Sequence, residues 1–301
     1  MAFRRMRKVE EAEYRAFIER NSYVRIGKNR IRLNTIPPET FSPPEFRPEE
    51  WTLWSFPERG EWATHHSAYR GNWSPYIPRN LIEKYTKHGD TVLDQMMGSG
   101  TTLVECRLTG RNGIGVDINR ETVMLAMNKL DFSLPDDLQK TEGRVELFIG
   151  DARNLDMIED SSIDLIATHP PYCGIIKYSS SGKKGDLSQL KLPEFMEAMK
   201  GVASEAFRVL RENRYCAVLI GDTRNRRHYV PISVGVLSVF LEEGFVLKEE
   251  IIKVQHRTRS SRERWKMRSY DFFKIGHEHL FIFRKPACGE DGEFKLSRKW
   301  W

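Results

Sequence analysis

The chain has 301 residues, 40% of them hydrophobic, which is enough for one large α/β domain plus an extension. No apolar run approaches the roughly 20 residues of a membrane-spanning helix, and the basic first residues lack the apolar stretch of a secretory signal. The four cysteines lie far apart without metal-ligand spacing, which argues against a zinc site and a disulfide scaffold. We therefore expect a globular, cytoplasmic protein with no metal and no membrane segment.

The net charge of +6 is concentrated in two segments. Residues 1–32 carry ten Arg and Lys against four Glu, and residues 253–268 carry seven against one. Basic blocks of this kind are typical of a surface that binds a polyanion, although each could also be a solvated face. The second block contains an aromatic residue, Trp265, which favours a nucleic-acid contact.

The chain divides into an extension (1–64), a regular domain (65–286) and a C-terminal tail (287–301). Residues 1–64 are basic and then Pro-rich, and from about residue 76 strand-like and helix-like patterns alternate. Strands are predicted at 91–94, 113–117, 145–149, 163–168 and 215–220, and helices at 78–87, 101–110, 120–130, 192–210 and 231–243. Two longer β runs follow at 246–254 and 279–284 without a helix between them. The pattern predicts a mainly parallel sheet covered on both faces, with an antiparallel pair at one edge.

The segment VLDQMMGSGTT (92–102) is typical of a strand, a glycine-rich turn and a helix. Gly98 and Gly100 allow a tight turn and let a ligand approach the N–H groups at the start of the helix. No Lys follows the glycines, so this is not a phosphate-binding P-loop.

Three carboxylates follow successive predicted strands. Asp94, Asp117 and Asp151 would line one crevice at the ligand-binding edge of a parallel sheet. Asp117 lies about where a nucleotide-binding fold has the carboxylate that accepts from the ribose hydroxyls. Each carboxylate could alternatively cap a helix.

The next predicted strand ends in THPPY (168–172). Pro170 and Pro171 fix two φ angles and remove two donors, which leaves rigid carbonyl acceptors, and Tyr172 offers a flat face to a base. This set suits methylation of an exocyclic amine, because acceptors for its N–H groups strengthen as positive charge develops on the nitrogen. His169 either accepts from the amine and takes the released proton, or only shapes the loop.

These motifs resemble those of the amino-methyltransferases that act on cytosine N4 and adenine N6. DQMMGSGTT (94–102) stands where that family has a motif like DPFxGSGTT, and HPPY (169–172) where it has (D/N/S)PP(Y/F/W). The resemblance covers about residues 65–286 and includes YRGNWSPYIPRNLI (69–82). It implies S-adenosylmethionine as cofactor and a Rossmann-like α/β fold with a mainly parallel seven-stranded sheet, an antiparallel edge hairpin and helices on both faces.

The resemblance also implies residue roles. Asp94 and the turn at 98–100 would hold the methionine part of the cofactor, Asp117 the ribose and Asp151 the adenine. The predicted cofactor residues are Tyr76, Asp94, Met96, Gly98, Ser99, Gly100, Thr101, Asp117, Ile118, Asp151 and Ala152. The predicted catalytic residues are His169, Pro170, Pro171 and Tyr172. Two departures stand out, since Gln95-Met96 replaces Pro-Phe and His169 replaces Asp, Asn or Ser.

A nucleic acid is the expected partner, bound through the loop after HPPY and the basic segment 255–277. The predicted substrate residues are Tyr178, Arg257, Arg259, Arg262, Arg264 and Trp265. Because a site-specific DNA enzyme needs a recognition module and little of the chain is left for one, we favour cytosine N4 of RNA, ribosomal RNA first. A DNA cytosine-N4 or adenine-N6 methyltransferase is the alternative. A silent cofactor-binding domain and a small-molecule methyltransferase stay open, as does the choice between monomer and homodimer.

Overall fold

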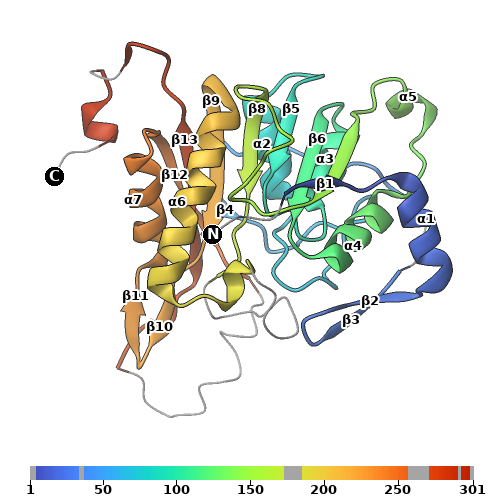
Figure 1. Ribbon diagram of the computed structural model, residues 1–301, viewed down its shortest axis with the longest axis horizontal. Coiled ribbons are helices and arrows are strands. Elements are labelled where there is room, and N and C mark those ends of the chain that lie inside the picture. Colours follow the sequence, from blue (N-terminus) through green and yellow to red (C-terminus); the bar gives the residue numbers. More distant parts are fainter. Residues whose placement is uncertain (1–4, 34–36, 173–184, 257–270, 291–292, 299–301) are drawn as a thin grey trace.

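A nine-stranded sheet forms the centre of the computed structural model, which describes residues 5–33, 37–172, 185–256, 271–290 and 293–298 (Figure 1). Seven strands match the expected sheet: β5 (Thr91–Asp94), β6 (Asn112–Asp117), β7 (Val145–Ile149), β8 (Ile163–Thr168), β9 (Leu210–Ile220), β12 (Val246–Val254) and β13 (His277–Arg284). They lie in the order β7-β6-β5-β8-β9-β13-β12. β13 runs antiparallel to both of its neighbours, and the other six strands are parallel to one another.

Two short N-terminal strands extend the expected seven strands to nine. β1 (Arg7–Lys8) pairs antiparallel with β7, and β4 (Leu53–Ser55) pairs parallel with β12. Both cover strands that would otherwise present unpaired N–H and C=O groups at the edges of the sheet. The Pro-rich segment therefore contributes a strand to the sheet.

The described part of the N-terminal basic block, residues 5–32, is packed against this domain. α1 (Glu11–Arg20) follows β1, and β2 (Tyr23–Ile26) and β3 (Asn29–Arg32) form a separate hairpin. Tyr14 of α1 is fully buried and donates to Asp131 at 2.9 Å, and Arg15 binds the same carboxylate through two hydrogen bonds of 2.7 and 2.8 Å. Lys8 contacts Glu146 at 2.7 Å. Part of the block is therefore neutralised within the fold.

Helices cover both faces of the sheet: α2 (Tyr76–Tyr85), α3 (Thr101–Leu108) and α4 (Arg120–Leu130) lie on one, α6 (Leu192–Val209) and α7 (Ile232–Glu242) on the other. Because side chains alternate along a strand, Val92 of β5 packs toward α2 whereas Leu93 packs toward α6. α6 buries Phe195, Met199 and Val202 at helical spacing. Short helices occur at α5 (Asp136–Gln139), η1 (Leu187–Gln189) and η4 (Lys295–Ser297).

The sheet changes winding direction between β5 and β8. From β5 the chain continues outward to β6 and β7, and from β8 it continues the other way to β9. Such a switch point opens a crevice at the carboxyl ends of the strands. Among the described helices, none is long and apolar enough to cross a membrane.

Candidate cofactor pocket and catalytic loop

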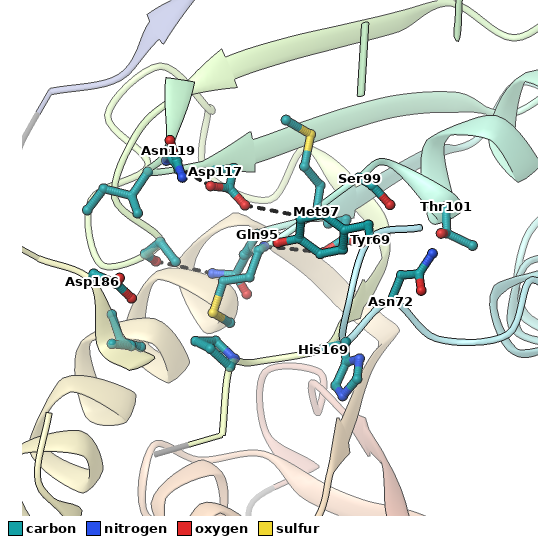
Figure 2. A pocket seen from close by; sticks show the side chains of 18 of the residues that line it. Tyr69, Asn72, Gln95, Met97, Ser99, Thr101, Asp117, Asn119, His169 and Asp186 are labelled. Carbon is teal, nitrogen blue, oxygen red and sulfur yellow. Dashed lines mark hydrogen bonds between the residues drawn. The ribbon is translucent and has the colours of Figure 1, made fainter. Parts of the chain in front are cut away.

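A pocket of about 850 Å³, including its open mouth, lies at the carboxyl ends of β5, β6, β7 and β8. This volume is in the range of small-molecule sites. The lining residues are Tyr69, Gly71, Asn72, Trp73, Asp94, Gln95, Met96, Met97, Gly98, Ser99, Thr101, Asp117, Ile118, Asn119, Asp151, Ala152, His169, Pro171, Gly185, Asp186 and Leu187. Figure 2 shows Tyr69 and Gln95 near the centre, with Asp117 on one side and His169 on the opposite side.

Asp117 ties the glycine turn after β5 to the end of β6. The Gly98 N–H donates to Asp117 Oδ2 at 3.2 Å, and the Asn119 N–H donates to Oδ1 at 2.8 Å. Gly98 has a φ of 52°, and a Cβ there would lie 3.1 Å from the Tyr69 ring. A side chain at this position would strain the backbone and crowd the pocket wall, so the turn needs glycine.

Asp94 is buried at the end of β5. It accepts from Thr102 Oγ1 at 2.6 Å and from the Met96 N–H at 3.2 Å. Burial raises the pKa of Asp94 to about 6, although these hydrogen bonds favour the charged form. The carboxylate is therefore ionised at neutral pH and becomes neutral below about pH 6.

Asp151 is held by a neighbour that sequence reasoning did not single out. Arg153 Nη2 and Nε contact the two Asp151 oxygens at 2.7 and 2.9 Å, and Asp151 is almost fully buried. A carboxylate has about four acceptor positions, so Asp151 keeps acceptor capacity beyond this bidentate pair. The pair fixes the orientation of Asp151 at the pocket wall.

Two buried polar atoms of the pocket lining have no hydrogen-bond partner among the described residues: Gln95 Oε1 and Thr101 Oγ1. The Gln95 amide nitrogen does have partners, the carbonyls of Ala152 at 3.3 Å and Val202 at 3.4 Å. Buried polar atoms are normally paired, because leaving one unpaired costs about 1–3 kcal/mol. A ligand that places a donor near Gln95 Oε1 and an acceptor near Thr101 Oγ1 would satisfy both atoms.

Most of the predicted cofactor residues line this one pocket. Gly100 does not, and it instead begins α3 with a φ of 79°. Tyr76 lies in the adjoining cleft, where its ring stacks on Phe56 at 5.2 Å and meets the edge of Trp62 at 4.8 Å. The residues that were not predicted include Tyr69, Asn72, Trp73 and Asp186. The quoted segment 69–82 already held the first three of them.

His169 begins a chain of hydrogen bonds that leads to β12 and β13. His169 Nε2 lies 2.9 Å from the Tyr172 hydroxyl, which donates to Glu278 Oε1 at 2.5 Å. Lys253 Nζ contacts Glu278 Oε2 at 2.9 Å. Trp73 stacks on the imidazole with ring centroids 5.8 Å apart. The HPPY loop is thereby fixed by residues from three separate parts of the chain.

This network determines the imidazole tautomer. Burial opposes the charge of Glu278, but the Lys253 ammonium 2.9 Å from its carboxylate holds the pKa of Glu278 below its usual range, so it is an ionised acceptor. The Tyr172 proton therefore goes to Glu278, and His169 Nε2 must carry the proton that Tyr172 accepts. Nδ1 is then the acceptor nitrogen, and among the described residues the ring's hydrogen bond is the one at Nε2.

Burial also keeps His169 neutral. It lowers the pKa of His169 to about 4, while the negative charge of Glu278 opposes this decrease. At neutral pH the ring is uncharged and the Nδ1 lone pair is available. The side chain can thus accept an N–H.

A large cleft of about 4750 Å³, open solvent included, adjoins the pocket, and His169 lines both. Pro170 and Tyr172 face this cleft, together with the Pro-rich segment around residues 56–62 and residues 221–224 after β9. The HPPY loop therefore lies where the small pocket meets the larger, open cleft.

The predicted substrate residues Tyr178, Arg257, Arg259, Arg262, Arg264 and Trp265 lie outside the described residues. The chain on either side of the basic segment does line the cleft, at Gln255, His256, Phe272 and Lys274. Within the described part of the chain, no group of three or more His, Cys, Asp or Glu side chains could hold a metal ion.

A family model described as DNA methylase matches residues 17–128 and 163–293, and the chain belongs to this family. It is 32% identical over 127 residues to the Type II methyltransferase M.BglI of Bacillus subtilis, across 35% of this chain and 36% of that relative. It is 31% identical over 132 residues to a tRNA (guanine(10)-N2)-dimethyltransferase of Methanothermobacter thermautotrophicus, across 43% of this chain and 35% of that relative. The chain thus spans little more than a third of these two relatives.

Among solved structures, a SAM-dependent methyltransferase from Methanosarcina mazei aligns with a TM-score of 0.48 and 18% identity, over 68% of this chain and 97% of that one. The strand order and family membership confirm the expected Rossmann-like α/β methyltransferase fold. S-adenosylmethionine is the cofactor, and the pocket fits it. The pocket offers carboxylates that can accept from hydroxyl and amine donors of the cofactor. It also offers the unpaired buried atoms Gln95 Oε1 and Thr101 Oγ1 to the charged amino-acid part of the cofactor.

Proposed function

We propose that the protein transfers a methyl group from S-adenosylmethionine to an exocyclic amine of a nucleobase, with DNA as the polymer. The observation that carries this proposal is the neutral acceptor Nδ1 of His169 at the junction of pocket and cleft. Membership in the DNA methylase family and the similarity to a Type II methyltransferase support DNA.

The pocket residues would hold the cofactor by complementary hydrogen bonds. Asp117 would accept from the ribose hydroxyls, and Asp151, oriented by Arg153, would accept from the adenine amine. Asp94 and the turn at 98–100 would face the methionine part of the cofactor. The amino and carboxylate groups of that part would supply hydrogen-bond partners for Gln95 Oε1 and Thr101 Oγ1. When bound, the cofactor would supply an electrophilic methyl group.

The catalytic loop would activate the amine by accepting its N–H groups. The lone pair of such an amine is delocalised into the base, and acceptors that bind the N–H groups favour the localised, attacking form. The Pro170 carbonyl would accept one N–H and His169 Nδ1 the other, and both bonds strengthen as the nitrogen becomes cationic. The methylated cation is strongly acidic, so an imidazole with a pKa of about 4 can still take its proton. Tyr172 would offer its ring to the base.

Cytosine N4 stays our first hypothesis for the target, and adenine N6 the second. RNA is a second candidate polymer, because the chain is also similar to a tRNA dimethyltransferase. A cytoplasmic location is part of the proposal, supported by the free thiols of Cys106, Cys216 and Cys288.

The test is transfer of labelled methyl from S-adenosylmethionine to unmethylated genomic DNA and, in parallel, to total RNA, followed by nucleoside analysis. Label in N4-methylcytosine of DNA is the expected result, and label only in RNA would replace DNA by the second candidate. Cofactor binding without transfer to either polymer would instead indicate a silent cofactor-binding domain. Label only in small molecules would overturn the nucleic-acid assignment.

A further inference from the structure

A small hairpin leaves the main sheet directly after β9. β10 (Thr223–Asn225) pairs antiparallel with β11 (His228–Val230), and Arg226 and Arg227 form the two-residue turn between them. Residues 225–229 are exposed. In Figure 1 the hairpin projects beyond the end of α7 at the lower left. Neither the proposed cofactor site nor the catalytic loop accounts for it.

The turn is strained by its two arginines. Arg226 has a φ of 47° and Arg227 a φ of 72°, so two consecutive residues with side chains adopt left-handed backbone conformations. Two-residue hairpin turns with both φ values positive favour Asn-Gly, which adopts them with little strain. Strain of this kind persists where the surroundings enforce it, and it is concentrated at functional positions. In exchange for this backbone strain, the turn presents two exposed guanidinium groups.

The base of the hairpin is tied to the body of the protein. The Asp222 carboxylate accepts from the Ser233 N–H at 2.7 Å and from Ser233 Oγ at 2.8 Å, and Tyr229 of β11 donates to the same carboxylate. Gly221 abuts the Tyr172 ring, where a Cβ would lie 3.0 Å from it. The hairpin therefore starts at the catalytic loop.

Arg224 connects the two strands of this hairpin to the chain at Phe272 and Phe273. Its guanidinium donates to the Phe273 carbonyl at 2.7 Å and the Arg227 carbonyl at 3.0 Å, and it lies 4.6 Å from the centre of the Phe272 ring. The tip carries two more guanidinium groups, those of Arg226 and Arg227. Arg227 lies 3.7 Å from Asp271, but both side chains are more than half exposed, and such a pair contributes little.

We propose that the β10–β11 hairpin docks duplex DNA, with Arg226 and Arg227 contacting phosphates at the major groove while the target base enters the cleft at His169. This rests on the proposed function in so far as the substrate is a nucleic acid. A two-stranded ribbon fits the major groove of B-DNA, which is about 12 Å wide, whereas the deep, narrow major groove of A-form RNA does not admit it. The hairpin would thereby supply part of a DNA-binding surface and position the duplex at the cleft.

The decisive variant is R226N/R227G, which removes both charges and installs the relaxed turn. Because it relieves strain, the midpoint of thermal unfolding should rise by roughly 2–4 °C. Loss of two phosphate contacts should lower the slope of log K against log salt by about 2 and weaken duplex DNA binding roughly 10- to 30-fold near physiological salt. Affinity for S-adenosylmethionine should not change. A merely structural turn would gain stability and keep its DNA affinity.

Two control variants isolate the cause. R226K/R227K keeps the charges and should retain the salt slope. K84Q/K87Q removes two exposed charges near the start of β5, at the edge of the sheet opposite the site, and should bind as the wild type does. Binding is measured by fluorescence anisotropy with a labelled DNA duplex and with an RNA duplex of the same sequence.

The outcomes separate this inference from the proposed function. If the wild type methylates DNA and R226N/R227G binds DNA like K84Q/K87Q, the docking role is wrong and the proposed function stands. An equal loss of affinity for the RNA duplex would also overturn it, because groove selectivity would be absent. If the wild type binds DNA through the hairpin but methylates neither polymer, the proposed function alone is wrong. Failure to bind or methylate DNA would overturn both.

Discussion

The two sides of the site are built in different ways. The cofactor side is made by consecutive strand ends and the turns that follow them, so Asp94, the 98–100 turn and Asp117 lie within a short stretch of sequence. The proposed catalytic side joins His169 and Tyr172 to Glu278 and Lys253, and Glu278 lies 106 positions after Tyr172 in the sequence. The first arrangement can be recognised as a motif in the sequence, whereas the second depends on strand pairing that only the structure reveals.

The sharpest test of this contrast is His169→Ala. Removal of the acceptor should lower the rate of methyl transfer roughly 100-fold or more, as loss of one preorganised transition-state contact does. Binding of S-adenosylmethionine, measured by calorimetry, should stay within a small factor of the wild-type value, because Asp117 and Asp151 are untouched.

His169→Asn is the matched control for this test, since Asn is one of the residues that the family motif carries at this position and its carbonyl is an acceptor. It should recover more of the rate than alanine does. Near-normal transfer by the alanine variant would mean that His169 only shapes the loop.

On the cofactor side, Asp117→Ala should weaken binding of S-adenosylmethionine about 10- to 100-fold, since each lost bond to a charged group is worth about 1.5–3 kcal/mol. The proper comparison is Asp137→Ala, which removes an exposed carboxylate of α5 outside the pocket. If both variants bind the cofactor equally well, Asp117 serves only to hold the Gly98 turn.

Glu278→Gln tests whether the long-range network positions His169. An amide can donate to Tyr172 as well as accept from it, so the tautomer with Nδ1 as acceptor is no longer enforced. We expect kcat at saturating cofactor to fall about tenfold, which corresponds to about 1.4 kcal/mol, with little change in KM for S-adenosylmethionine.

The pH profile gives this test a second readout. Protonation of His169 removes its acceptor, so kcat should decrease on the acid side as the pH approaches its pKa of about 4. Because the charge of Glu278 raises that pKa, the acid limb should move to lower pH in Glu278→Gln. An unshifted limb would show that Glu278 has only a structural role.

The same contrast explains which elements the sequence could predict. The seven principal strands were predicted because each carries a continuous apolar or alternating pattern next to turn residues. β1 and β4 have two and three residues, too few to show a period, and they pair with edges formed much later in the chain. Arg153 was missed because a bidentate partner two residues from Asp151 leaves no spacing signature.

The smallest expected effect concerns Tyr76, where a motif and the structure point to different places. The segment 69–82 led to Tyr76 as a cofactor residue, yet its ring lies in the cleft against Phe56 and Trp62. Tyr76→Phe keeps both ring contacts and removes only the hydroxyl, so affinity for S-adenosylmethionine should change less than about twofold, well under the 1.4 kcal/mol of a tenfold effect. Calorimetric titration of this variant beside the wild type measures the difference. A tenfold loss of affinity would mean that the cofactor reaches beyond the pocket to α2, and the boundary between the cofactor side and the substrate side would then lie at Tyr76 and no longer at His169.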